Sequence, residues 1–149
     1  MINVVLVQPE IHWNTGNAGR SCLAAGAQLH LIEPLGFSMD DRYLKRAGLD
    51  YWEHVEPKVW ADWESFLPSV NPASLIFFST SAERLYWDVD YPADATLVFG
   101  RETGGLPPLL RDEYPDRFVR IPILSPEVRS LNLSTAVGIA LYEAMRRSE

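Results

Sequence analysis

The residues best suited to chemistry lie in one short stretch, residues 97–107, with the sequence LVFGRETGGLP. An apolar run typical of a buried strand leads into a turn with three glycines, one arginine and one acid. A strand needs glycine at its end where the backbone takes a positive φ or lets another group approach closely. Gly100, Gly104 and Gly105 around the carboxylate of Glu102 therefore predict a loop that contacts a ligand with its backbone, although an ordinary strand–loop–helix connection has a similar composition.

Two other stretches carry unusual polar residues. Residues 9–20, PEIHWNTGNAGR, lead into a predicted helix that holds Arg20 within about its first turn, and residues 122–134 form a long connection before the last predicted helix. In a parallel sheet, ligands bind beyond the carboxyl ends of the strands. We therefore expect residues 78–81, 100–105 and 122–134, each of which follows a predicted strand, to contribute to one pocket.

The elements that must position these residues alternate between strands and helices. We predict strands at residues 2–8, 29–32, 51–55, 75–78, 95–99 and 118–121. Helices are predicted from a start near residues 15–17 to residue 25, and at 40–47, 60–67, 107–111 and 135–147. Gly26 should end the first helix, and Trp52, Trp60 and Trp63 should pack against the sheet. This alternation predicts an α/β fold with a mainly parallel sheet and helices on both faces.

Composition limits the function classes. No repeat, low-complexity tract or linker interrupts residues 1–149, so we expect a single domain. No apolar run approaches the roughly 20 residues of a membrane span, and the first residues read as a strand without a signal peptide. The lone cysteine, Cys22, is expected to pack inside a helix and fits a reducing cytosol. We therefore expect a cytoplasmic protein with no membrane partner.

The net charge of −7 argues against a general nucleic-acid binder, which is usually basic. Basic residues nevertheless gather locally, as ordinary solvated faces often do. The clusters are Arg42, Lys45 and Arg46; Arg111, Arg117, Arg120 and Arg129; and Arg146 and Arg147.

Several kinds of site lack their usual pattern. His12, His30 and His54 lie far apart in the sequence, so we predict no metal site. No phosphate-binding Gly-Lys-Ser/Thr and no Gly-x-Ser-x-Gly nucleophile elbow occurs. A Rossmann-type dinucleotide-dependent oxidoreductase stays a distant alternative, because Gly16, Gly19 and a later acid, Glu33, partly fit its fingerprint while the first glycine is missing.

Three motifs taken together resemble those of the SPOUT RNA methyltransferases. They are NTGNAGR at residues 14–20, FGRETGGLP at residues 99–107, and Ile121-Pro122 followed by RSLNLS at residues 129–134. IEPLGF at residues 32–37 and RAGLDY at residues 46–51 narrow the match to the TrmL type, which methylates the ribose 2′-OH of the tRNA wobble nucleotide, cytidine or modified uridine 34. The resemblance spans nearly the whole chain in order and spacing.

The resemblance implies an α/β fold with a deep C-terminal trefoil knot, a homodimer, a tRNA substrate and S-adenosylmethionine as the methyl donor. The alternatives to methylation at nucleotide 34 are 2′-O-methylation at another tRNA or rRNA site, or a non-catalytic RNA-binding module. The donor pocket of the family falls here on Phe78, Ser79, Thr80, Phe99, Gly100, Gly105, Ile121, Ser130, Leu131 and Asn132.

The family's motif-one arginine matches Arg20, and positions tied to RNA binding or catalysis in the family match Arg129, Ser130 and Tyr142. Glu102, in the glycine turn, completes the five candidate catalytic residues. Because a guanidinium has a pKa above about 12, we interpret Arg20 as a phosphate clamp and a stabiliser of the 2′-oxygen. Glu102 is a candidate for proton acceptance or for cofactor placement; the alternative is that it organises the glycine turn.

The sequence also departs from the family pattern, in ways that bear on tRNA recognition. Arg101 stands where the family commonly has proline, Gly104 where it commonly has arginine, and the loop at residues 125–128 is one residue longer. Since the chain is acidic, we expect RNA to bind where two subunits pool their basic residues. That pooled patch would consist of Arg42, Lys45, Arg46, Arg129, Arg146 and Arg147.

Overall fold

The structure, a computed structural model, describes residues 1–39 and 51–148. At its centre is a seven-stranded sheet in the order β3-β2-β1-β6-β4-β7-β5, in which every neighbouring pair is parallel. The strands are β1 (Asn3–Val7), β2 (Gln28–Ile32), β3 (Lys58–Trp60), β4 (Leu75–Phe78), β5 (Arg84–Leu85), β6 (Thr96–Phe99) and β7 (Phe118–Arg120).

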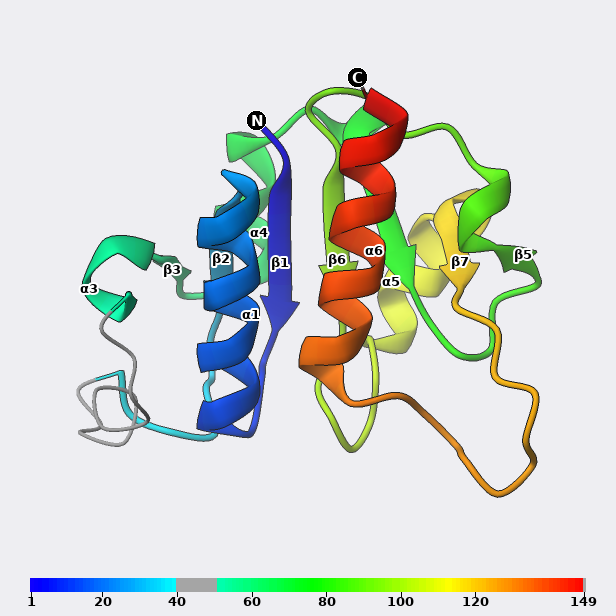
Figure 1. The fold of residues 1–149 in the computed structure, drawn as a ribbon, viewed down its shortest axis with the longest axis horizontal. Coiled ribbons are helices and arrows are strands. Elements are labelled where there is room, and N and C mark those ends of the chain that lie inside the picture. The colour runs from blue at the N-terminus through cyan, green and yellow to red at the C-terminus, as the bar shows by residue number, and fades with distance from the viewer. Residues whose placement is uncertain (40–50, 149) are drawn as a thin grey trace.

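Helices cover both faces of the sheet, as the sequence predicted. Helices α1 (His12–Ala25) and α6 (Leu133–Ser148) lie side by side on the face toward the viewer in Figure 1, and α4 (Trp63–Phe66) and α5 (Pro108–Glu113) lie behind it. The short α3 (Trp52–Val55) packs beside α1. Single 3₁₀ turns occupy Leu67–Ser69, Pro72–Ser74, Tyr86–Asp88 and Pro115–Arg117.

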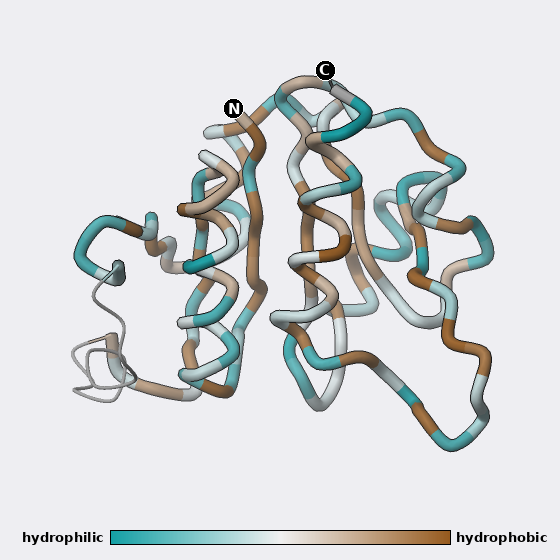
Figure 2. Tube along the Cα trace, viewed as in Figure 1, coloured by the Kyte–Doolittle hydropathy of each residue, from teal (hydrophilic) through white to brown (hydrophobic). Residues whose placement is uncertain are grey.

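The strands are apolar because both faces of the sheet are buried. Along β1, Val4 and Leu6 join the core beneath α1 and α6, whereas Val5 and Val7 join the core beneath α4 and α5. Figure 2 shows this strand mainly in the hydrophobic colour. Cys22 of α1 is buried in the first core, which raises the pKa of its thiol to about 12 and leaves it a packing residue, as predicted.

Most predicted elements are confirmed with shifted ends. Gly26 ends α1 in the left-handed conformation (φ 70°), which a residue without Cβ adopts easily. Trp52 is buried, and Trp60 and Trp63 pack partly buried against the second core. The helix predicted at residues 40–47 lies outside the described residues. The single domain and the trefoil knot stay predictions.

Two element predictions were wrong. A strand was predicted at residues 51–55, but Trp52–Val55 form the helix α3, in which Trp52 packs on α1 so closely that a Cβ on Gly19 would lie 2.7 Å from its ring. The helix predicted at residues 60–67 shrinks to α4, since Trp60 ends β3 and Asp62 caps the helix by accepting the N–H of Ser65 at 2.7 Å. The strands β3 and β5 were not predicted, because three and two residues are too few to show a hydrophobic period in the sequence.

Within the described residues, none of the helices combines the length and the apolar character that a bilayer crossing requires.

The imidazole of His30, on β2, is buried and contacts side chains of the two neighbouring strands, β1 and β3. His30 is 2% exposed, with Nε2 2.8 Å from Oδ1 of Asn3, and its Nδ1 accepts the indole N–H of Trp60 at 3.1 Å. Because an indole N–H can only donate, Nδ1 must be the unprotonated nitrogen, and Nε2 donates to Asn3. Burial, and secondarily the charge of Lys58, lower the pKa of His30 to about 4.

We expect His30 to make folding stability depend on acid. The unfolded histidine takes up a proton near pH 6.5 and the folded one only near pH 4, so stability is lost as the pH falls between these values, by about 3 kcal/mol. Urea unfolding of the wild type and of His30→Gln at several pH values measures this loss. The free energies of unfolding of the wild type and of His30→Gln should converge by that amount between pH 6.5 and 4. Parallel curves would contradict the neutral buried imidazole.

Candidate functional site

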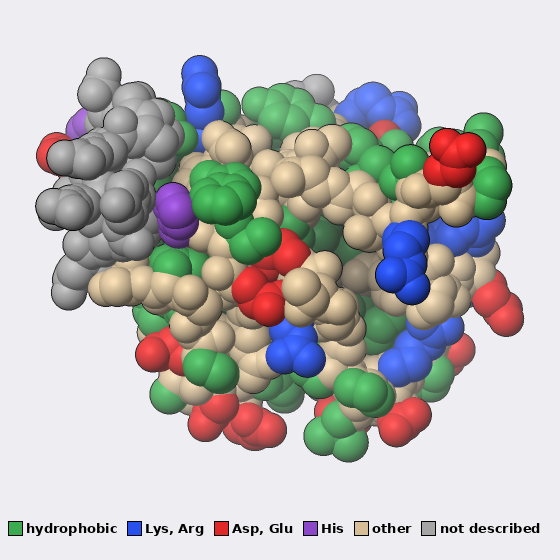
Figure 3. All heavy atoms as spheres, turned by 90° about the horizontal axis from the view of Figure 1, so that it is seen from below, with side chains coloured by type: hydrophobic (Ala, Val, Ile, Leu, Met, Phe, Trp, Pro, Cys, Tyr) green, Lys and Arg blue, Asp and Glu red, His purple; other side chains and the backbone are tan. Residues whose placement is uncertain are grey.

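A cavity of about 1000 Å³ opens at the carboxyl ends of β4, β6 and β7. Its lining comes from residues 78–81 and 99–106, from residues 121, 123, 129–133 and 136, and from Ile11 and Asn14 at the start of α1. Figure 3 looks onto this end of the molecule and shows acidic side chains beside a hollow with hydrophobic walls. The three loops that the sequence singled out therefore meet at one cavity.

All ten residues predicted for the donor pocket line this cavity: Phe78, Ser79, Thr80, Phe99, Gly100, Gly105, Ile121, Ser130, Leu131 and Asn132. Of the five predicted catalytic residues, Glu102, Arg129 and Ser130 line it, whereas Arg20 and Tyr142 do not. Six more lining residues belong to the three segments expected to form one pocket: Ser81, Arg101, Thr103, Gly104, Ile123 and Leu133. Four lining residues were not predicted: Ile11, Asn14, Leu106 and Ala136. Asn14 and Leu106 lie inside the quoted motifs, so taking those motifs whole would have found them.

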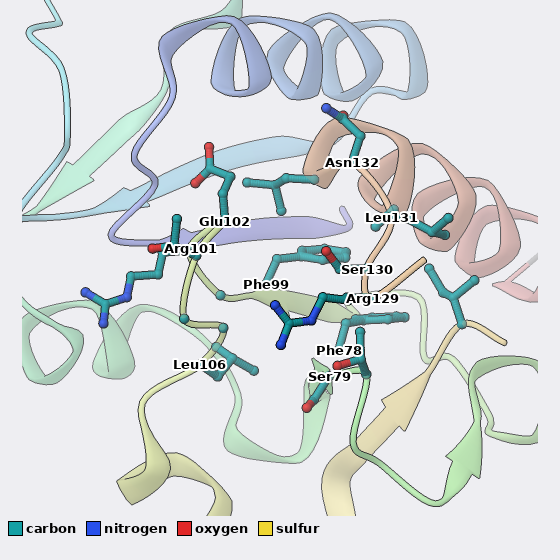
Figure 4. Close-up of a pocket in the computed structure, with 18 of the residues that line it drawn as sticks. Phe78, Ser79, Phe99, Arg101, Glu102, Leu106, Arg129, Ser130, Leu131 and Asn132 are labelled. Carbon is teal, nitrogen blue, oxygen red and sulfur yellow. The ribbon is translucent and has the colours of Figure 1, made fainter. Parts of the chain in front are cut away.

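Two aromatic rings form one wall of the cavity. Phe78 and Phe99 are paired across β4 and β6, and their rings stack with centroids 4.7 Å apart and planes 11° apart. Figure 4 shows Ser79 next to Phe78. The hydroxyl Oγ of Ser79 lies 3.0 Å from Oγ of Ser81. An apolar wall with a few polar groups at its edge is typical of a pocket for a small organic ligand.

The glycines of residues 100–105 are required by the path of the loop. A Cβ on Gly100 would lie 2.1 Å from the carbonyl carbon of Gly105, and Gly105 takes a positive φ of 67°. The N–H of Gly105 donates to the carbonyl of Arg101 at 3.0 Å, which closes the loop on itself. The loop can therefore double back beside the cavity only with glycine at these two positions.

Glu102 fixes this loop to the start of α1. One carboxylate oxygen accepts the backbone N–H of Glu10 at 2.9 Å, and the other accepts the N–H of Ile11 at 3.0 Å and the amide of Asn14 at 3.1 Å. These N–H groups stand at the amino end of a helix, where a carboxylate is favourable. With three donors already on its two oxygens, the carboxylate is better placed to organise the turn than to accept a proton.

The carboxylate of Glu10 makes the reciprocal contact, from the start of α1 to the glycine loop. Oε1 of Glu10 accepts both the backbone N–H of Thr103, at 2.8 Å, and its hydroxyl, at 2.7 Å. These hydrogen bonds lower the pKa of Glu10. Each segment thus supplies a carboxylate to the backbone of the other, and we call these paired contacts of Glu10 and Glu102 the carboxylate clamp.

Asn14 extends the carboxylate clamp to the third loop. This buried side chain donates to Glu102, and its Oδ1 accepts from Nδ2 of Asn132 at 3.0 Å. Oδ1 of Asn132 in turn accepts the backbone N–H groups of Ser134, at 2.9 Å, and Thr135, at 3.3 Å, and so caps α6. One chain of side chains therefore joins all three motif segments.

Arg20 and Tyr142 lie on the exposed surfaces of α1 and α6. The guanidinium of Arg20 lies over the ring of Tyr51, 5.6 Å from its centre, and Tyr142 is 50% exposed. Trp13, on α1, is also exposed, at 55%. The structure of one chain does not bring Arg20 and Tyr142 to the cavity.

The structure describes only some of the residues of the predicted basic patch. Arg42, Lys45 and Arg46 lie outside the described residues. Arg146 pairs with Glu143 at 2.8 Å, and Arg147 pairs with Asp90 at 3.5 Å, so their charges are partly balanced within the chain. Arg129 is exposed at the cavity, where Figure 4 shows its side chain reaching across the opening.

Comparison with known proteins identifies the family, since residues 1–142 match the SpoU rRNA methylase family. The chain belongs to this family. A tRNA (cytidine(34)-2′-O)-methyltransferase of Burkholderia pseudomallei (strain 1106a) is 46% identical, over 99% of this chain and 96% of the relative. The family-level resemblance seen in the three motifs is thereby confirmed.

Solved structures of SpoU-like proteins share the fold. A structure that gives insights into the 2-OH methylation of C/U34 on tRNA has a TM-score of 0.90 and 42% identity, covering 99% of this chain and 90% of the other. An AdoMet-bound rRNA methyltransferase from Sinorhizobium meliloti has a TM-score of 0.81 and 25% identity, covering 97% of this chain and 56% of the other.

We expect Glu102→Gln to lower the free energy of unfolding by about 2 kcal/mol, because an amide NH₂ group would face a backbone N–H that now meets a carboxylate oxygen. Thr103→Val, which removes one exposed hydroxyl donor from the same clamp, should change the free energy of unfolding much less. Urea denaturation of both variants measures the difference. Unchanged stability in Glu102→Gln together with lost methyl transfer would instead assign Glu102 to proton transfer.

Proposed function

We propose that this SpoU-family chain transfers a methyl group from S-adenosylmethionine to the ribose 2′-oxygen of nucleotide 34 in tRNA. The proposal is carried by the convergence of three loops, distant in sequence, on one cavity at the ends of β4, β6 and β7. A relative that is named for this reaction and is 46% identical over 96% of its own length supports the choice of substrate. With tRNA as substrate, the cytoplasmic location expected from the sequence belongs to the same proposal.

The cavity fits the proposed donor in size and in chemistry. Its volume of about 1000 Å³ reaches the upper part of the range of small-molecule sites. Phe78, Phe99 and Leu131 offer apolar surface to an adenine ring, and the backbone of the glycine loop and the hydroxyls of Ser79 and Ser130 offer hydrogen bonds. When bound, S-adenosylmethionine supplies an electrophilic methyl group on a sulfonium.

The protein's own contribution is mainly alignment. The carboxylate clamp and the Asn14–Asn132 hydrogen bond hold the loop walls in one arrangement before any ligand arrives. Apolar walls exclude water from the methyl group, and a fixed geometry can lower the barrier by up to roughly 7–11 kcal/mol. Arg129 and Ser130, on the third loop, are positioned to contact the incoming nucleotide.

Arg20 enters this proposal through a second copy of the chain. Its side chain is exposed on α1, away from the cavity of its own chain, and the same surface presents Trp13, Leu23 and Tyr142 to solvent. Exposed large apolar side chains on adjacent helices favour a subunit contact. In a homodimer formed through α1 and α6, the guanidinium of one chain would reach the cavity of its partner, clamp a phosphate and stabilise the 2′-oxygen.

Mixed dimers test this arrangement. Arg20→Ala and the cavity-filling Leu131→Trp should each abolish methyl transfer alone. After unfolding and refolding together in equal amounts, about a quarter of the wild-type activity should return, since half of the dimers then hold one intact site. Sedimentation of each variant alone controls for dimer formation. No recovered activity in mixtures shown to exchange subunits would place Arg20 and the cavity in the same chain.

The donor and the target are tested together. Calorimetry should show binding of S-adenosylmethionine, and mass mapping of bulk tRNA after incubation should show one added methyl on the ribose of nucleotide 34. Donor binding with methylation at another position would replace the substrate. Absence of donor binding would favour a non-catalytic RNA-binding module, and binding of a nicotinamide dinucleotide instead would favour an oxidoreductase.

A further inference from the structure

Arg101 and Gly104 fit together across the glycine loop. The carbonyl of Arg101 accepts the N–H of Gly105, so this residue is fixed at the base of the loop, and its side chain folds back over Gly104. A Cβ on Gly104 would lie 2.7 Å from Nε and 3.0 Å from Nη2 of Arg101. The guanidinium therefore occupies the space in which a side chain at position 104 would begin.

The guanidinium of Arg101 points away from the cavity. Figure 4 shows it outside the glycine loop, on the side opposite to Phe99, while the backbone of the loop faces the cavity. Within the described residues, none of the ion pairs involves Arg101, although its charge contributes to the lowered pKa of Glu10. Its side chain is exposed. Arg101 therefore lines the cavity with its backbone side, while its guanidinium points outward and leaves a cation at the rim.

We propose that Arg101, held in place by the absence of a side chain at Gly104, binds a phosphate of the RNA next to the target nucleotide. The inference rests on the proposed function and names a recognition residue for it. A planar guanidinium with several N–H donors suits a phosphate, and in a chain of net charge −7 a backbone phosphate needs a local cation where it approaches the acidic clamp. Arg101 and Gly104 thus act together, because the missing side chain at position 104 leaves the space that the guanidinium occupies.

Binding of bulk tRNA at several salt concentrations tests this contact. Arg101→Ala should weaken binding about 10-fold at low salt and reduce the slope of log affinity against log salt by about 0.7–0.9, the contribution of one phosphate contact. It should raise KM for tRNA with little change in kcat, and leave the affinity for S-adenosylmethionine unchanged. Arg84→Ala, which removes the same charge from the edge strand β5, should leave the slope unchanged.

Two further variants test whether the position of the guanidinium matters as well as its charge. Gly104→Ala should displace the guanidinium and reduce affinity in the same direction as Arg101→Ala. The double variant Arg101→Ala/Gly104→Arg should restore the salt slope, because it returns a cation to the same space. Thermal unfolding of each variant checks that the loop still folds.

The outcomes distinguish this inference from the proposed function. If wild-type protein methylates nucleotide 34 while Arg101→Ala keeps the slope of Arg84→Ala, the phosphate contact is overturned and the function stands. If Arg101→Ala changes donor affinity instead, Arg101 belongs to the donor site and the inference is also wrong. If the wild type does not bind tRNA at all, the proposed function fails and takes this inference with it.

Discussion

The carboxylate of Glu102 holds the candidate site together, because it accepts two backbone N–H groups at the start of a helix and the side-chain amide of Asn14. The N–H groups of Glu10 and Ile11 stand at the start of α1, where a helix leaves donors unpaired, and Ile11 makes no side-chain cap of its own. An acid 91 residues away from Ile11 in the sequence supplies the acceptor. Helix start and glycine loop are therefore formed together, and the wall of the cavity exists only when the sheet has brought β1 and β6 side by side.

Parallel pairing explains why the remaining loops arrive at the same place. Strands β4, β6 and β7 run in one direction, so the segment that follows each of them emerges at the same edge of the sheet. Asn132 then ties the third segment to Asn14 and caps α6 with the same side chain. Because one amide serves both purposes, the packing of α6 on α1 and the closure of the cavity are coupled.

The sequence allowed the central strands, the parallel sheet and the three loops that meet at the cavity to be inferred, because buried strands form apolar runs and glycine marks backbone that must turn or come close. It did not reveal that α1 begins at His12, since the acceptor for its first N–H groups comes from another loop. It misassigned residues 51–55 because the need of Trp52 to pack against Gly19 is tertiary. Motif matching placed Arg20 among the catalytic residues, yet the structure leaves it on the exposed surface of α1 and outside the lining of the cavity.

Charge divides the site into an inner and an outer part. The acids nearest the cavity, Glu10 and Glu102, are engaged by N–H and O–H donors, so their negative charge stabilises the loop while still repelling an approaching polyanion. Cations must therefore stand farther out, where Arg129 crosses the opening and Arg101 projects from the loop's outer side. Gly104 permits this arrangement by leaving room for the guanidinium of Arg101. An acidic chain can thus bind RNA through a few placed cations, because screening in salt confines each charge to about 10 Å.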